Sequence, residues 1–181
     1  MKNSKLKYIF SHLGAPLFVF TLIITTIIGC NTSECYDNKN SLPLAGFYSS
    51  SEKPQKISID SISILGIGAP GDSILQDSVR SLSQSYLPFR IDEGKTTYVI
   101  RYLAGIAGAL QLADTITFNY EIKPWFVSSA CGVIYDYKMM SIETTHLYID
   151  SVTCPTGEIT NANTENLRIY FRVSEEGGEE L

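Results

Sequence analysis

Histidine is scarce in this chain of 181 residues, and only His146 follows Cys30. The four cysteines form no CxxC pair and no cluster with histidine. Zinc and copper sites usually combine several imidazole and thiolate ligands, and a serine hydrolase needs a histidine base beside a nucleophile, often within a GxSxG motif, which is absent here. The sequence therefore predicts no metal site, no cofactor and no catalytic residue.

Other binding motifs are missing as well. Asp72 and Asp77 lie near glycines, in what we expect to be a loop, but the ligand spacing of an EF-hand is absent, so we interpret them as solvated turn residues. His146 alternates with Leu147 and Ile149, which we expect to point inward, and so we expect His146 to be exposed beside Tyr148. The chain is therefore not expected to be an enzyme.

The first thirty residues contain the one long apolar run. It extends over residues 15–28, which is shorter than the ~20 residues of a comfortable membrane span, and it is preceded by Lys2, Lys5 and Lys7. Gly29 and Cys30 follow it directly. This order is typical of a bacterial lipoprotein export signal, so we expect residues 1–29 to be removed and Cys30 to be acylated, for example with palmitate.

Composition limits what the remaining 152 residues can bind. Three of the 14 basic residues and none of the 19 acidic ones lie in residues 1–29, so the remainder carries a formal charge of −8. Nucleic acid is an improbable partner, because its binding depends on neutralising phosphates. We expect a flexible tether over residues 30–41, one domain over 42–173 and a disordered acidic tail over 174–181.

Period-two alternation of apolar and polar residues dominates the expected domain. It predicts strands over residues 115–122, 133–139, 147–149 and 167–173, with Val133 and Leu147 facing inward. Further strands are predicted over 42–48, 56–65, 86–91 and 97–103, and a phase change in the second of these indicates a bulge near Asp60 and Ser61. The fold class is all-β, an antiparallel β-sandwich of immunoglobulin-like or Greek-key type.

Two features leave room for ligand contact. Residues 104–113 are small and apolar, and form either a cap over one end of the sandwich or a contact site for a partner or membrane surface. Trp125 and the eleven tyrosines could stack on a sugar, although strand packing explains most of the tyrosines.

Four segments carry a resemblance to a known family: residues 59–67, 114–120, 129–135 and 149–152. With the apparent lipidation motif, they resemble an uncharacterised family of small lipoproteins from Bacteroidota. The likeness spans nearly all of the expected mature chain, and it implies location and fold but no activity.

The cysteines following Cys30 allow more than one disulfide. Export to an oxidising compartment favours a disulfide, and from the residues alone pairing Cys131 with Cys154 is as reasonable as pairing Cys131 with Cys35. The resemblance implies Cys35–Cys131, because an early cysteine and an Ala-Cys-Gly cysteine belong to its pattern.

Asp-Ser/Thr-aliphatic triplets are similar to an O-glycosylation motif of exported Bacteroidota proteins. Ser73 and Ser78 are the candidate sites, since both fall in the expected loop. The other matches are explained by aspartates that end turns before strands.

Taken together, these features favour a lipid-anchored envelope protein of the outer membrane that acts as a structural or protein-interaction module. The alternative is a glycan- or peptide-binding accessory protein of an uptake complex. A concave cluster of Trp125 and tyrosines would favour that alternative.

Overall fold

The computed structural model describes residues 41–68, 74–102, 112–129 and 131–172, all within the compact unit Cys35–Leu181. Within these ranges the regular secondary structure is all β, as expected, and no helix has the length and apolar character needed to cross a membrane. The strands are β1 (Leu44–Ser49), β2 (Ile62–Gly66), β3 (Ile74–Val79), β4 (Gln84–Tyr86), β5 (Lys95–Tyr102), β6 (Leu112–Ser128), β7 (Gly132–Thr144), β8 (Ile149–Thr153), β9 (Glu158–Ile159) and β10 (Glu165–Phe171).

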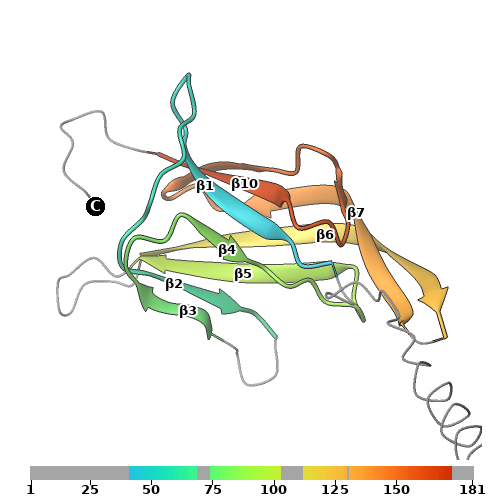
Figure 1. Ribbon diagram of the computed structural model, residues 1–181. Helices are drawn as coiled ribbons and strands as arrows, with labels where there is room; N and C mark the ends of the chain where they lie inside the picture. The colour runs from blue at the N-terminus through green and yellow to red at the C-terminus, as the bar shows by residue number, and fades with distance from the viewer. Residues whose placement is uncertain (1–40, 69–73, 103–111, 130, 173–181) are drawn as a thin grey trace, which may run out of the picture. The chain divides into compact units, whose positions relative to one another are not determined.

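The strands form two sheets that pack as a β-sandwich (Figure 1). Sheet A has the order β3-β2-β5-β6-β7-β9, and sheet B has the order β4-β1-β10-β8. The pairing is antiparallel except between β1 and β10, which run parallel. This parallel pair departs from the fully antiparallel arrangement that the sequence predicts, and it places the first and last described strands side by side.

The core lies between the sheets and is built from the inward phase of each strand. Phe89, which follows β4, packs its ring on those of Tyr120 and Tyr137 at centroid distances of 4.5 and 5.4 Å. Burial raises the pKa of Tyr137 to about 12, so its phenol stays neutral. Core packing therefore accounts for several tyrosines, as predicted. The largest fully buried side chains include Phe47, Ile62, Ile64, Leu87, Ile100, Ile116, Phe118, Ile134, Ile149, Ile159 and Leu167.

The expected strand over 56–65 is broken where its alternation changes phase. Ser61 has a φ of 54°, a left-handed conformation that a regular strand does not contain, and β2 begins only at the next residue. Before the break the chain makes only isolated bridges, through Lys56 and Ile59. The predicted irregularity near Asp60 and Ser61 is confirmed, but it ends the strand and does not merely bend it.

Other sequence predictions were wrong. The segment expected as a loop around Asp77 forms β3, and the strand expected over 86–91 ends at Tyr86. Val133 is 41% exposed and Leu147 is 44% exposed, although both were predicted to face the core. Val133 lies on β7 opposite Phe126, beyond the part of β6 that pairs with β5, and Leu147 lies before β8 begins.

A long hairpin of β6 and β7 extends sheet A. Their pairing runs from Ile116↔Thr144 to Ser128↔Gly132, whereas β5 pairs with β6 only as far as Asn119. The far part of the hairpin therefore continues past β5, as Figure 1 shows.

One buried carboxylate fixes the passage from sheet A to sheet B. Asp114 on β6 is fully buried and accepts hydrogen bonds from the backbone N–H groups of Leu147, Tyr148 and Ile149, at 2.8, 2.8 and 3.0 Å. The hydroxyls of Tyr102 and Thr145 also donate to it, at 2.9 and 2.8 Å. All five donors are neutral, and together they hold the segment that joins β7 to β8.

Hydrogen bonds keep the Asp114 carboxylate ionised in the folded protein. Burial alone would raise the pKa of Asp114, but the backbone and side-chain donors outweigh it and lower the pKa below its usual value. The folded state therefore favours the charged carboxylate, and this contribution to stability is complete above the pKa of the unfolded chain.

We predict that Asp114→Asn lowers the free energy of unfolding at pH 7 by about 2–4 kcal/mol, because an amide replaces a charged acceptor among buried donors. The difference between the two proteins should shrink as the pH falls below about 4, where the unfolded carboxyl takes up a proton. Urea denaturation at pH 7 and pH 3 measures both effects.

Asp150→Asn is the matched control. Asp150 is exposed and pairs with Arg172 at 3.5 Å, so its loss should cost less than about 1 kcal/mol. Equal destabilisation by the two substitutions would contradict the structural role of Asp114.

Candidate functional site

The outer face of sheet B gathers aromatic and charged side chains from three strands. Residues that pair across neighbouring strands share a face, and Tyr48 pairs with Tyr170 while Gly46 pairs with both Arg168 and Gln84. The alternate residues of β1 and β10 are buried core residues, which places this set on the opposite, outward side. We call it the sheet B face, defined by Gly46, Tyr48, Lys56, Gln84, Tyr86, Glu165, Arg168 and Tyr170.

Glu165 organises the centre of this face. One carboxylate oxygen accepts hydrogen bonds from the Tyr48 hydroxyl at 2.7 Å and from Arg168 Nε at 3.1 Å. The other oxygen lies 3.5 Å from Lys56 Nζ. Lys56 Nζ also donates to Gln84 Oε1 at 2.8 Å, so the network joins β1, β4 and β10.

Gly46 makes room for this arrangement. A Cβ atom at this position would lie 2.1 Å from Glu165 Oε2 and 3.0 Å from a ring carbon of Tyr48. Any larger residue would displace the Glu165 side chain, so the glycine is required by close approach and not by its backbone angles.

The charges on this face are set by mutual contact. Burial tends to raise the pKa of Glu165, but hydrogen bonds from Tyr48 and Arg168 and the charge of Lys56 lower it overall. The hydrogen bond to Glu165 raises the pKa of Tyr48. Glu165 is thus ionised and Tyr48 is neutral at neutral pH, so the face presents a fixed set of charges and hydrogen-bond donors.

Aromatic rings and a guanidinium lie around the network. Arg168 sits 5.5 Å from the centre of the Tyr48 ring, and the Tyr48 and Tyr170 rings are 5.8 Å apart. Tyr86 is 45% exposed, and the side chain of Arg168 is 46% exposed. Both groups can therefore reach a partner.

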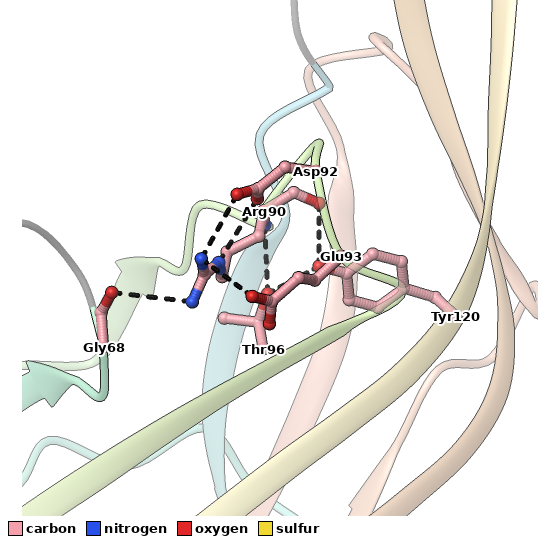
Figure 2. A network of polar contacts seen from close by, with 6 residues as sticks. All are labelled: Gly68, Arg90, Asp92, Glu93, Thr96 and Tyr120. Atoms are coloured by element: carbon pink, nitrogen blue, oxygen red, sulfur yellow. Dashed lines mark hydrogen bonds and ion pairs between the residues drawn. The ribbon is translucent and has the colours of Figure 1, made fainter.

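A second polar cluster, around Arg90, has a structural role (Figure 2). Its guanidinium contacts Asp92 and Glu93 at 3.2 and 3.1 Å, while its backbone N–H donates to Thr96 Oγ1. Its carbonyl accepts a hydrogen bond from Tyr120 at 2.9 Å. These contacts hold the turn before β5 against the aromatic core. The Arg90 guanidinium is therefore paired with acidic side chains of its own domain.

Several residues singled out by the sequence lie outside the described residues: Cys30, Cys35, Ser73 and residues 104–111. Ser78 lies in the edge strand β3 and is exposed, so its glycosylation stays a prediction. Cys131 directly precedes β7 and is 7% exposed. Cys154 is a free cysteine, and burial raises the pKa of its thiol, which favours the protonated form.

His146 is exposed, as predicted, and its carbonyl accepts a hydrogen bond from Arg172 at 2.8 Å. Across the described ranges, no group of three or more His, Cys, Asp or Glu side chains could hold a metal ion.

The aromatic residues considered for sugar binding are divided between the sheets. Trp125 lies on β6 in sheet A, whereas Tyr48, Tyr86 and Tyr170 lie on sheet B. The sequence placed Arg168 outward but did not reveal the sheet B face, because the pairing of β1 with β10 joins segments more than a hundred residues apart.

Comparison with known proteins gives a family without an assigned role. No curated protein and no solved structure matches the chain. A family profile matches residues 61–171, which is more than half of the chain and includes every strand except β1. The chain therefore belongs to the family of unknown function DUF6452.

Proposed function

We propose that this protein is a lipid-anchored, non-enzymatic module of the cell envelope that binds a protein partner through the sheet B face. The observation that carries the proposal is the Glu165 network, which holds Tyr48, Lys56 and Arg168 in one arrangement at the surface. Side chains that are already ordered lose less entropy on binding, so such a face is preorganised for contact.

The residue types favour a protein partner. Tyrosine and arginine are enriched at protein interfaces and among the residues that contribute most to binding. The outer face of sheet A differs, because its central positions form a polar ladder in which Thr97 meets Thr117 and Asn119 meets Ser141. A ladder of small polar groups supplies less contact area than the tyrosines of the sheet B face.

Glycan binding is the alternative. The Tyr48 and Tyr170 rings could stack on a sugar, but they are tilted 40° from each other, and Trp125 lies in the other sheet. A flat aromatic platform would be the stronger support for this alternative.

The anchor is proposed from the sequence of the first thirty residues. Basic residues, a short apolar run and Gly29-Cys30 support export, cleavage and acylation of Cys30. Two or more acyl chains provide stable attachment, and we propose the outer membrane as the location.

We also propose a disulfide between Cys35 in the tether and Cys131 in the domain. The support is that Cys154 is a free cysteine, so it is not the partner of either Cys35 or Cys131. Such a bond would tie the tether to the start of β7.

We predict that Cys30→Ser moves the protein out of the membrane fraction or blocks its processing, because the thiol that carries the acyl chains is lost. Fractionation and mass spectrometry of the native protein measure this. Cys154→Ser is the control and should leave attachment unchanged. Membrane attachment with normal processing in Cys30→Ser would refute the anchor.

The disulfide is expected to stabilise the domain by about 4–5 kcal/mol, because it closes a loop of nearly a hundred residues in the unfolded chain. Peptide mapping without reduction should join Cys35 to Cys131. A peptide that joins Cys154 to either of them would show that the pairing is wrong.

The partner surface can be tested by photocrosslinking in living cells. A crosslinking amino acid at position 86 or 170 should capture one envelope protein, whereas the same amino acid at Glu143 on sheet A should not. Arg168→Glu should weaken capture at position 86 by about tenfold or more, as for a central interface residue.

Three outcomes would count against this function. Equal capture from both faces, or no capture from positions 86 and 170, contradicts binding through the sheet B face. Capture of polysaccharide in place of protein would support the glycan alternative instead.

A further inference from the structure

The far part of the β6–β7 hairpin has an exposed apolar surface. We call residues 124–129 and 131–135 the hairpin end, since they lie beyond the Lys123↔Asp136 pair and beyond the last pairing of β6 with β5. Within it Trp125, Phe126 and Val133 are 38%, 67% and 41% exposed. Three large apolar side chains exposed on one short segment are typical of a surface that contacts another molecule or a membrane.

The hairpin end is also free of charge. No Asp, Glu, Lys, Arg or His occurs over residues 124–135. The nearest charged residues already have partners, because Lys123 contacts Glu158 at 3.0 Å and Asp136 accepts a hydrogen bond from Ser41 at 2.8 Å. The hairpin end could therefore enter a less polar medium without removing an ionised side chain from water.

The start of the described chain lies beside this surface. Ser41 is 1% exposed, its backbone N–H donates to the Tyr135 carbonyl at 3.3 Å, and its hydroxyl donates to Asp136. Tyr135 pairs with Pro124, directly next to Trp125. The chain therefore enters the domain at the base of the hairpin end.

The stretch of chain between Cys30 and Ser41 is short. Ser41 lies eleven positions after Cys30, and this stretch spans at most about 40 Å when fully extended. If the proposed Cys35–Cys131 disulfide forms, the residue bonded to the hairpin end lies only five positions after the lipidated cysteine, a reach of about 18 Å. An anchor at Cys30 thus keeps the hairpin end close to the bilayer.

We propose that the hairpin end is a second membrane contact, in which Trp125, Phe126 and Val133 lie in the interfacial region of the bilayer that holds the Cys30 lipid. This inference rests on the proposed lipid anchor. Tryptophan and other aromatic rings favour the membrane interface, where an apolar body and a polar edge are both accommodated. The contact would hold the domain in one orientation, which acyl chains on a flexible tether cannot do.

The bilayer fits this surface better than a protein partner does. A protein interface usually contains hydrogen-bonding and charged groups around its apolar centre, and the hairpin end has no charge to offer. The tether supplies a local reason for proximity to lipid, and it supplies none for a protein.

The test uses the single tryptophan of the chain, because the fluorescence of Trp125 reports directly on the hairpin end. The full, lipidated protein is reconstituted into phosphatidylcholine vesicles with or without brominated acyl chains, and flotation of the vesicles measures anchoring separately. We expect Trp125 emission to shift to shorter wavelength than in detergent-free Cys30→Ser protein, and to be quenched by the brominated chains.

Phe126→Ser should reduce the quenching without changing flotation. Ile74→Ser is the matched control, because Ile74 is a 54% exposed apolar residue on the edge strand β3 and its loss should leave quenching unchanged. Circular dichroism checks that both variants fold.

The outcomes separate the two proposals. Protein that floats while Trp125 remains unquenched by brominated lipid and open to aqueous acrylamide contradicts the membrane contact alone. Protein that does not float contradicts the anchor and this inference together. Shielding of Trp125 in intact envelopes but not in pure lipid vesicles would identify the hairpin end as a protein interface and overturn the proposal.

Discussion

The buried Asp114 carboxylate is the interaction on which the arrangement of the two sheets depends. It lies on β6 in sheet A and binds three successive backbone N–H groups at the entrance to β8 in sheet B. The chain crosses between the sheets at this point, so the carboxylate takes the place of backbone partners that a crossing segment lacks. β8 then pairs with β10, and β10 with β1. Asp114 thus holds the start of β8, and the strands that carry the sheet B face are added to β8 in turn.

This dependence explains why the proposed function uses contact and not chemistry. Asp114 and Glu165 both have lowered pKa values, because burial is outweighed by hydrogen-bond donors that stabilise the charge. A general base that works near neutral pH needs the opposite shift. Their charges instead hold a chain crossing and a set of surface side chains in place, which suits a rigid domain that presents a surface.

The sequence predicted the parts of the fold that depend on local alternation. Ile116, Phe118 and Tyr120 are buried as expected, and the irregularity at Ser61 coincides with a phase change. Sequence reasoning failed for the features that depend on contacts between distant segments of the chain. The Asp114-Thr115-Ile116 triplet matches the Asp-Ser/Thr-aliphatic glycosylation pattern. In the structure, however, the Asp114 carboxylate accepts hydrogen bonds from backbone groups more than thirty positions later. The parallel pairing of β1 with β10, and hence the sheet B face, has no local signature. Trp125 could be noted from composition, but its place beside the entry of the chain could not.

The central claim is that the sheet B face is covered by a partner in the cell, and hydroxyl-radical footprinting of side chains tests it most directly. Oxidation is compared between native envelopes and the purified lipoprotein in vesicles. The account predicts that Tyr86 and Tyr170 are oxidised much less in envelopes, while Met140, which is 65% exposed on β7, is oxidised equally in both. Equal oxidation of Tyr86 and Tyr170 in the two preparations would contradict it.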